Sequence, residues 1–171
     1  MSDLSEGVPF DGYYFFAFDA TALYRVPPYE KNFARTRTDE PFRLAVVPGN
    51  IEVGPLHLPQ PLEPKLAHFE MVDGKRKKYH ARIWLNKGST PRLIFLNGSH
   101  LTRIAHIEAA QFLRQRDGLP PLSTGNENLV YGLQHAKLPQ VRIHHLFLSG
   151  PIIDHWPTRT HKEILGGSTY E

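Results

Sequence analysis

Proline and glycine punctuate this chain along most of its length. The sequence contains fifteen prolines and thirteen glycines among 171 residues. Proline lacks a backbone N–H and fixes φ, and glycine favours turns, so this punctuation predicts short strands and few helices. Short apolar runs predict strands at 13–18, 42–47, 68–72, 79–85, 92–96 and 141–148.

Helical spacing of apolar residues occurs in only a few places. It predicts a helix over 102–116 and a second over 126–136, with a short helical turn from Asp19 to Tyr24. The Asp73-Gly74 pair, which stands between two strand-like runs, predicts a hairpin. The aromatic run 13–18 (YYFFAF) predicts a strand that is buried on both faces.

Length and composition indicate one folded domain. Hydrophobic residues make up 40% of 171 residues, which is enough for a core and too much for a disordered chain. The pattern predicts an α+β fold, with a small mixed sheet and two or three helices in a single domain over residues 1–171. Residues 151–171 read as a tail rich in proline and glycine.

The residues that the chain lacks exclude several classes of chemistry. There is no cysteine, which rules out disulfides, thiolate zinc sites and a cysteine nucleophile and favours a cytoplasmic location. No apolar run predicts a membrane span, and the N-terminal residues do not resemble a signal peptide. The net charge of +3 and the pI of about 9.2 are compatible with a nucleic-acid partner.

The segment 92–116 carries the strongest functional signal. An apolar run ends at Asn97-Gly98, and Ser99-His100 lead into a helix-like pattern. A strand that turns into a helix presents unpaired N–H groups and a positive dipole end, which favour an anion such as phosphate. The predicted phosphate-binding or nucleotide-binding residues are Asn97, Gly98, Ser99, His100 and Arg103. The alternative is a plain strand–turn–helix connection.

Hydrolysis of a phosphodiester or of ATP would need a base close to that junction. His100 and Glu108 are the nearest candidates in sequence, and such chemistry would use ATP and a divalent metal ion as cofactors. Ten histidines raise the alternative of a metal site formed by His100, His106, His144 and His145. Their spacing does not favour it, because neighbouring strand residues point to opposite faces, so we predict no protein metal site.

Two basic segments are candidates for binding DNA. Lys75, Arg76, Lys77 and Lys78 form the densest run, where phosphate contacts would be independent of sequence. Arg35 and Arg37 follow Tyr29 and Phe33, a combination that could hold and stack on a single strand. The alternatives are a solvated turn and an ordinary surface loop.

The strand–Asn97-Gly98-Ser99-His100–helix pattern resembles the phosphate-binding loop of the ParB/sulfiredoxin-like superfamily. There a strand ends in Gly-x-His-Arg or Gly-Glu-Arg-Arg, and Gly98 and His100 match, while Leu101 occupies the arginine position. Glu127-Asn128 resembles the Glu-Asn-x-x-Arg segment of that superfamily, with Tyr131 in place of arginine. The resemblance implies that Glu127 could serve as an alternative catalytic acid. Sulfiredoxin activity is excluded because it needs a cysteine.

Within that superfamily, size and strand content are most similar to plasmid fertility-inhibition factors. This resemblance implies a protein that suppresses conjugative or T-DNA transfer, with DNA as partner and with DNase and ATPase activity. The alternative is a catalytically inactive ParB-like protein that binds DNA or inhibits a coupling protein of conjugation or type IV secretion. In that version Trp84, Trp156 and Tyr24 could anchor the partner.

Overall fold

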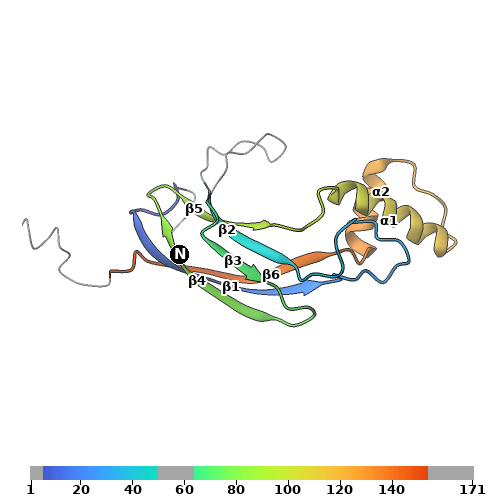
Figure 1. The fold of residues 1–171 in the computed structure, drawn as a ribbon. Helices are drawn as coiled ribbons and strands as arrows, with labels where there is room; N and C mark the ends of the chain where they lie inside the picture. The colour runs from blue at the N-terminus through green and yellow to red at the C-terminus, as the bar shows by residue number, and fades with distance from the viewer. Residues whose placement is uncertain (1–5, 50–63, 154–171) are drawn as a thin grey trace, which may run out of the picture.

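The computed structural model describes residues 6–49 and 64–153, and it contains both helices and strands (Figure 1). The eight elements of the described residues are β1 Gly12–Leu23, β2 Arg43–Gly49, β3 Ala67–Glu70, β4 Lys77–Leu85, β5 Thr90–Phe95, α1 Thr102–Arg116, α2 Gly125–His135 and β6 Gln140–Ser149. The helix predicted at 102–116 is confirmed at both ends. Trp156 and most of the predicted tail, residues 154–171, lie outside the described ranges.

The described strands form two antiparallel sheets of three strands each. Sheet A has the order β4-β1-β6, and sheet B has the order β3-β2-β5. The expected single mixed sheet is therefore wrong in its arrangement. A periodic pattern identifies strands but does not specify which strands pair, and pairing here joins segments far apart in the chain.

The hairpin predicted around Asp73-Gly74 is also wrong, because its two strands lie in different sheets. Leu44 of β2 pairs with Phe69 of β3, whereas Phe18 of β1 pairs with Tyr79 of β4. The connection 71–76 is longer than the two-residue loop that closes a tight hairpin. Gly74 still adopts the left-handed conformation expected of a turn glycine, with φ +66°.

β1 carries the main core between the sheets. Tyr14, Phe16 and Phe18 point inward and are buried, and the Phe18 ring lies 5.1 Å from the ring of Phe69 in sheet B. Tyr13 and Phe15 point outward and are exposed, so the expectation that this run is buried on both faces is wrong. β1 continues to Leu23 because β4 and β6 pair with its far end, which replaces the predicted helical turn.

The helices pack together beyond one end of the sheets, as Figure 1 shows. A second apolar cluster there joins Ala105 and Ala109 of α1 to Phe33, Ala34 and Leu138 from the flanking loops. The backbones of α1 and α2 lie in close contact at Gly132, where a Cβ atom would lie 2.1 Å from the carbonyl oxygen of His106. The helix pair therefore depends on a residue without a side chain at this position.

Replacing Gly132 with alanine is expected to lower the free energy of unfolding by about 1–3 kcal/mol, because the added methyl group forces the two helices apart. Urea unfolding followed by circular dichroism measures this change. The matched control is Gly125→Ala in the same helix, where a Cβ atom meets no neighbour within 4 Å. Equal stability of the two variants would contradict the packing described here.

Candidate functional site

A pocket of about 330 Å³ lies at the N-terminal end of α1. One wall is the junction segment from Gly98 to His100, together with Thr102 and His106 of α1. The opposite wall comes from the residues that lead into β6, Leu138 to Val141, and Ala34 closes one side. Three segments distant in sequence thus meet around the residues that the sequence singled out as an anion site.

The backbone of the junction turns sharply against the end of β5. A Cβ atom at Gly98 would lie 2.6 Å from Cδ1 of Phe95, so the close approach of loop and ring needs glycine. The Leu101 N–H donates to Oγ of Ser99 at 3.1 Å, and the Thr102 hydroxyl donates to the Ser99 carbonyl oxygen at 3.1 Å. Because Oγ of Ser99 accepts here, its own proton remains to be donated to a ligand.

The first turn of α1 is electropositive. Its N-cap residue, Leu101, provides no side-chain cap, and the turn contains no acidic residue. α2 differs, since Thr124 and Glu127 form a complete capping box at its start. The first turn of α1, whose Thr102 lines the pocket, therefore has no acidic side chain of its own to neutralise the helix dipole and the unpaired N–H groups.

Two histidines line this pocket. His100 is exposed at the junction, and His106 follows one turn into α1. Nδ1 of His106 lies 2.7 Å from the Thr102 carbonyl oxygen, which can only accept, so Nδ1 carries a proton and donates it. Nε2 is then the nitrogen left to meet a ligand. From the sequence, His106 enters only the alternative metal site with His100, which the spacing disfavours, although its i, i+4 spacing from Thr102 places the two on one helix face.

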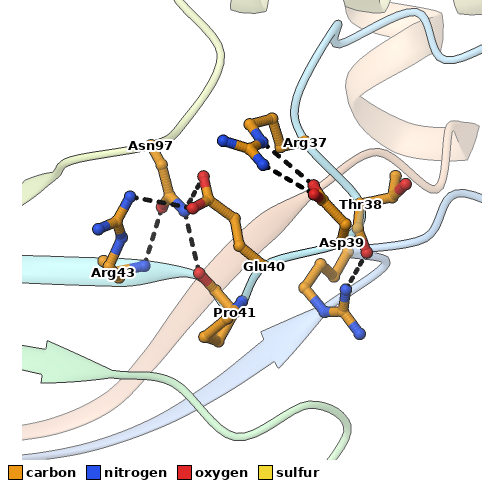
Figure 2. A network of polar contacts seen from close by, with 8 residues as sticks. Arg37, Thr38, Asp39, Glu40, Pro41, Arg43 and Asn97 are labelled. Atoms are coloured by element: carbon orange, nitrogen blue, oxygen red, sulfur yellow. Dashed lines mark hydrogen bonds and ion pairs between the residues drawn. The ribbon is translucent and has the colours of Figure 1, made fainter.

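Asn97, at the start of the junction, is held by the residues that lead into β2, in the network of Figure 2. Its Oδ1 accepts from the Arg43 N–H at 2.8 Å, and its Nδ2 donates to the Pro41 carbonyl oxygen at 2.9 Å and to Oε1 of Glu40 at 3.2 Å. The guanidinium of Arg43 reaches the same carboxylate at 3.1 Å. The Asn97 amide thus fastens the junction to the start of β2, and its predicted contact with phosphate stays a prediction.

The remaining predicted site residues engage other parts of the molecule. Arg103 donates to Oδ1 of Asn126 in α2 at 2.9 Å. The Glu108 carboxylate lies 3.4 Å from Nζ of Lys31 and 4.0 Å from the Arg35 guanidinium. Oε2 of Glu127 accepts from the Thr124 N–H at 3.1 Å as part of the capping box. Neither glutamate lines the pocket.

The loop that carries Arg35 and Arg37 packs against α1. Arg37 forms a two-pronged pair with Asp39, at 2.7 and 3.1 Å, which holds the pKa of Asp39 below its ordinary value. Phe33 is buried with its ring 5.4 Å from that of Phe112, so it is not available to stack on bases. The predicted DNA contacts of the two arginines stay predictions.

The basic segment 75–78, which runs from the turn after Gly74 into the first two residues of β4, lies at the same end of sheet A as the pocket. Ala22 of β1 pairs with Val141, which lines the pocket, and bridges on its other edge to Asp73. Two strand spacings place Asp73 about 10 Å from Val141. Within the segment, Arg76 donates to Asp19 at 2.6 Å and keeps the pKa of Asp19 below its ordinary value. Lys75, Lys77 and Lys78 are exposed.

Comparison with known proteins gives no match to a family model, to a curated protein or to a solved structure. Within residues 6–49 and 64–153, no group of three or more histidine, aspartate and glutamate side chains lies close enough together to hold a metal ion. None of the helices in these ranges has the length and apolar character needed to cross a membrane.

Replacing Asn97 with alanine is expected to lower the free energy of unfolding by about 1–3 kcal/mol, because three hydrogen bonds are lost together, to Arg43, Pro41 and Glu40, of which the one to Glu40 is partly buried. Denaturant unfolding measures the loss. The control Asn126→Ala removes one exposed hydrogen bond, to Arg103, and is expected to change stability by about 0.5 kcal/mol or less. An Asn97→Ala variant as stable as this control would contradict the fastening role.

Proposed function

We propose that this chain is a DNA-binding protein of the plasmid fertility-inhibition kind, in which the pocket at the start of α1 holds a backbone phosphate. One observation carries the proposal. The pocket brings Gly98, Ser99 and His100 together at a helix N-terminus that has no side-chain cap. Donors of this type, arranged around a positive dipole end, suit a phosphate group.

The chemistry of the pocket supports a phosphate in particular. The Ser99 hydroxyl retains a donor proton, and an imidazole N–H of His100 could donate as well. Nε2 of His106 can donate to a phosphate only when the ring carries both protons, because its Nδ1–H is already bonded to the Thr102 carbonyl oxygen. No carboxylate lines the pocket to repel an anion. The basic segment 75–78, on the other edge of β1, would add positive charge along the path of a DNA backbone.

The positions of the acids favour binding over hydrolysis assisted by a carboxylate. Glu108 faces Lys31 and Arg35, and Glu127 caps its own helix. A catalytic acid or base must reach the reacting group within hydrogen-bond distance, and neither side chain lines the pocket. On this proposal the protein would suppress plasmid transfer by occupying DNA or a transfer protein bound to DNA.

A nuclease or nucleotide hydrolase is the second candidate function. It is favoured by His100 and His106, which line one pocket and could act as base and as phosphate ligand. ATP and a divalent metal ion would be the cofactors to supply in its assay. The two candidates share the phosphate site and differ in whether a bond is broken.

Fluorescence anisotropy with labelled duplex DNA tests the binding proposal. We expect His100→Ala to weaken binding about tenfold or more, since a hydrogen bond to a charged group contributes about 1.5 kcal/mol or more. Inorganic phosphate should compete with DNA for the unaltered protein. The matched control is His68→Ala, an exposed histidine on β3 outside the pocket. Equal affinity of the two histidine variants would overturn the proposed site.

Incubation with single-stranded and duplex DNA, and with ATP, in Mg²⁺ or Mn²⁺ separates the two candidates. The binding proposal expects neither cleavage nor ATP turnover. Cleavage or turnover that His100→Ala abolishes and His68→Ala preserves would instead establish the hydrolytic candidate. In donor cells, expression of the protein should lower the frequency of plasmid transfer, and His100→Ala should restore it.

A further inference from the structure

The outer face of sheet A carries aromatic rings in a regular arrangement. Side chains directly opposite in an antiparallel pair lie on the same face of the sheet. The register places Tyr13 beside Trp84, Phe15 beside Arg82, and Ala17 between His80 and Phe147. Successive rows along β1 are about 6.8 Å apart, since alternate strand residues share a face.

These rings are exposed and are oriented by one another. The exposed fractions are 43% for Tyr13, 39% for Phe15, 45% for Trp84 and 48% for Phe147. Tyr13 packs edge-on against Trp84 at 5.1 Å, and Phe15 packs edge-on against Phe147 at 6.4 Å. The arrangement leaves aromatic surface open to solvent across all three strands of one sheet.

The charged side chains of the same face are mostly positive. On this face the register places Lys78 and Arg82 of β4 opposite Asp19 and Phe15 of β1, and Arg142 of β6 opposite Thr21. Asp19 is the one acidic residue of the three strands. Asp19 is already paired with Arg76, whose guanidinium lies 2.6 Å from its carboxylate. The Arg82 guanidinium lies over the Tyr13 ring at 4.3 Å. Exposed rings surrounded by cations match a ligand that combines flat apolar groups with negative charge.

We infer that the outer face of sheet A, defined by Tyr13, Phe15, Trp84 and Phe147, binds single-stranded nucleic acid. Its bases would stack on the exposed rings, while the phosphates would meet the basic residues of β4 and β6. Duplex DNA fits this face poorly, because paired bases present no free ring surface and the major groove admits a two-stranded ribbon rather than a three-stranded sheet.

This inference shares with the proposed function only its class of ligand, which is nucleic acid, and it rests on that proposal to this extent. Its binding surface is separate from the pocket, because none of the four rings lines the pocket. A nucleic-acid strand that follows β1 across sheet A would reach the basic segment 75–78 near the C-terminal end of β1, where Lys78 pairs with Asp19. The two sites would therefore hold different parts of one nucleic acid.

Anisotropy of a labelled oligo-dT strand, with an RNA strand and a duplex as parallel probes, tests the inference. We expect tight binding to a single strand, weaker binding to the duplex, and about a tenfold loss for each of Phe15→Leu and Phe147→Leu. Phe147→Trp should keep or increase affinity, because it retains a stacking ring. These substitutions keep apolar bulk, so circular dichroism should show the fold unchanged.

Matched controls separate this face from other surfaces. Leu133→Ala removes an apolar side chain that is 60% exposed on α2, and it should leave single-strand binding unchanged. Arg142→Glu should reduce the dependence of affinity on salt, whereas Lys65→Glu, ahead of β3, should not. The preference between oligo-dT and RNA identifies which strand the face takes.

Three results would overturn the inference. The first is unchanged single-strand affinity in both leucine variants. The second is equal affinity for duplex and single strand. The third is a dimer in light scattering that Phe147→Leu converts to monomer, which would make the face a contact between two copies. Loss of single-strand binding in His100→Ala with no loss in the leucine variants would assign that binding to the pocket alone.

Discussion

The rest of the structure depends on the pairing of β1 on both of its edges. This strand has twelve residues, and it is held by β4 on one side and by β6 on the other. Its inward rings at Phe16 and Phe18 build the core against sheet B, and burial of such side chains supplies the main stabilising free energy. Because β6 begins beside the end of β1, the same pairing brings residues 138–141 to the helix end and forms one wall of the pocket.

Two kinds of interaction position the junction between β5 and α1. The Asn97 amide fixes it to the start of β2 through hydrogen bonds, while Gly98 allows the loop to close over the Phe95 ring. The apolar contacts of Ala105 and Ala109 with Phe33 and Leu138 then hold α1 in place. Packing and hydrogen bonds therefore fix the position of the first helical turn beside the pocket, and a binding site of any kind gains affinity from such preorganisation.

Sequence reasoning succeeded where a local pattern decides the outcome. α1 begins and ends at the predicted residues because apolar spacing acts within a few turns of one chain, and Gly118, just beyond the C-cap Asp117, adopts the left-handed conformation that ends many helices, with φ +67°. It failed for Asp73-Gly74, a good turn signal that joins two different sheets. It also failed for the run from Tyr13 to Phe18, where aromatic residues occupy both faces of the strand. The expected alternation of apolar and polar residues is absent there, so the sequence did not reveal that one face is exposed.

Local patterns in the sequence are enough to predict the strand–Asn97-Gly98-Ser99-His100–helix junction, the two helices and the apolar runs that become strands. The division of these strands into two antiparallel sheets, and the pairing of Glu108 with Lys31 and Arg35, emerge only when the chain folds. The same is true of the pocket that His106 shares with His100. The physical reason is that helix formation is governed by neighbours three and four residues apart, whereas strand pairing and pocket walls depend on contacts between distant segments.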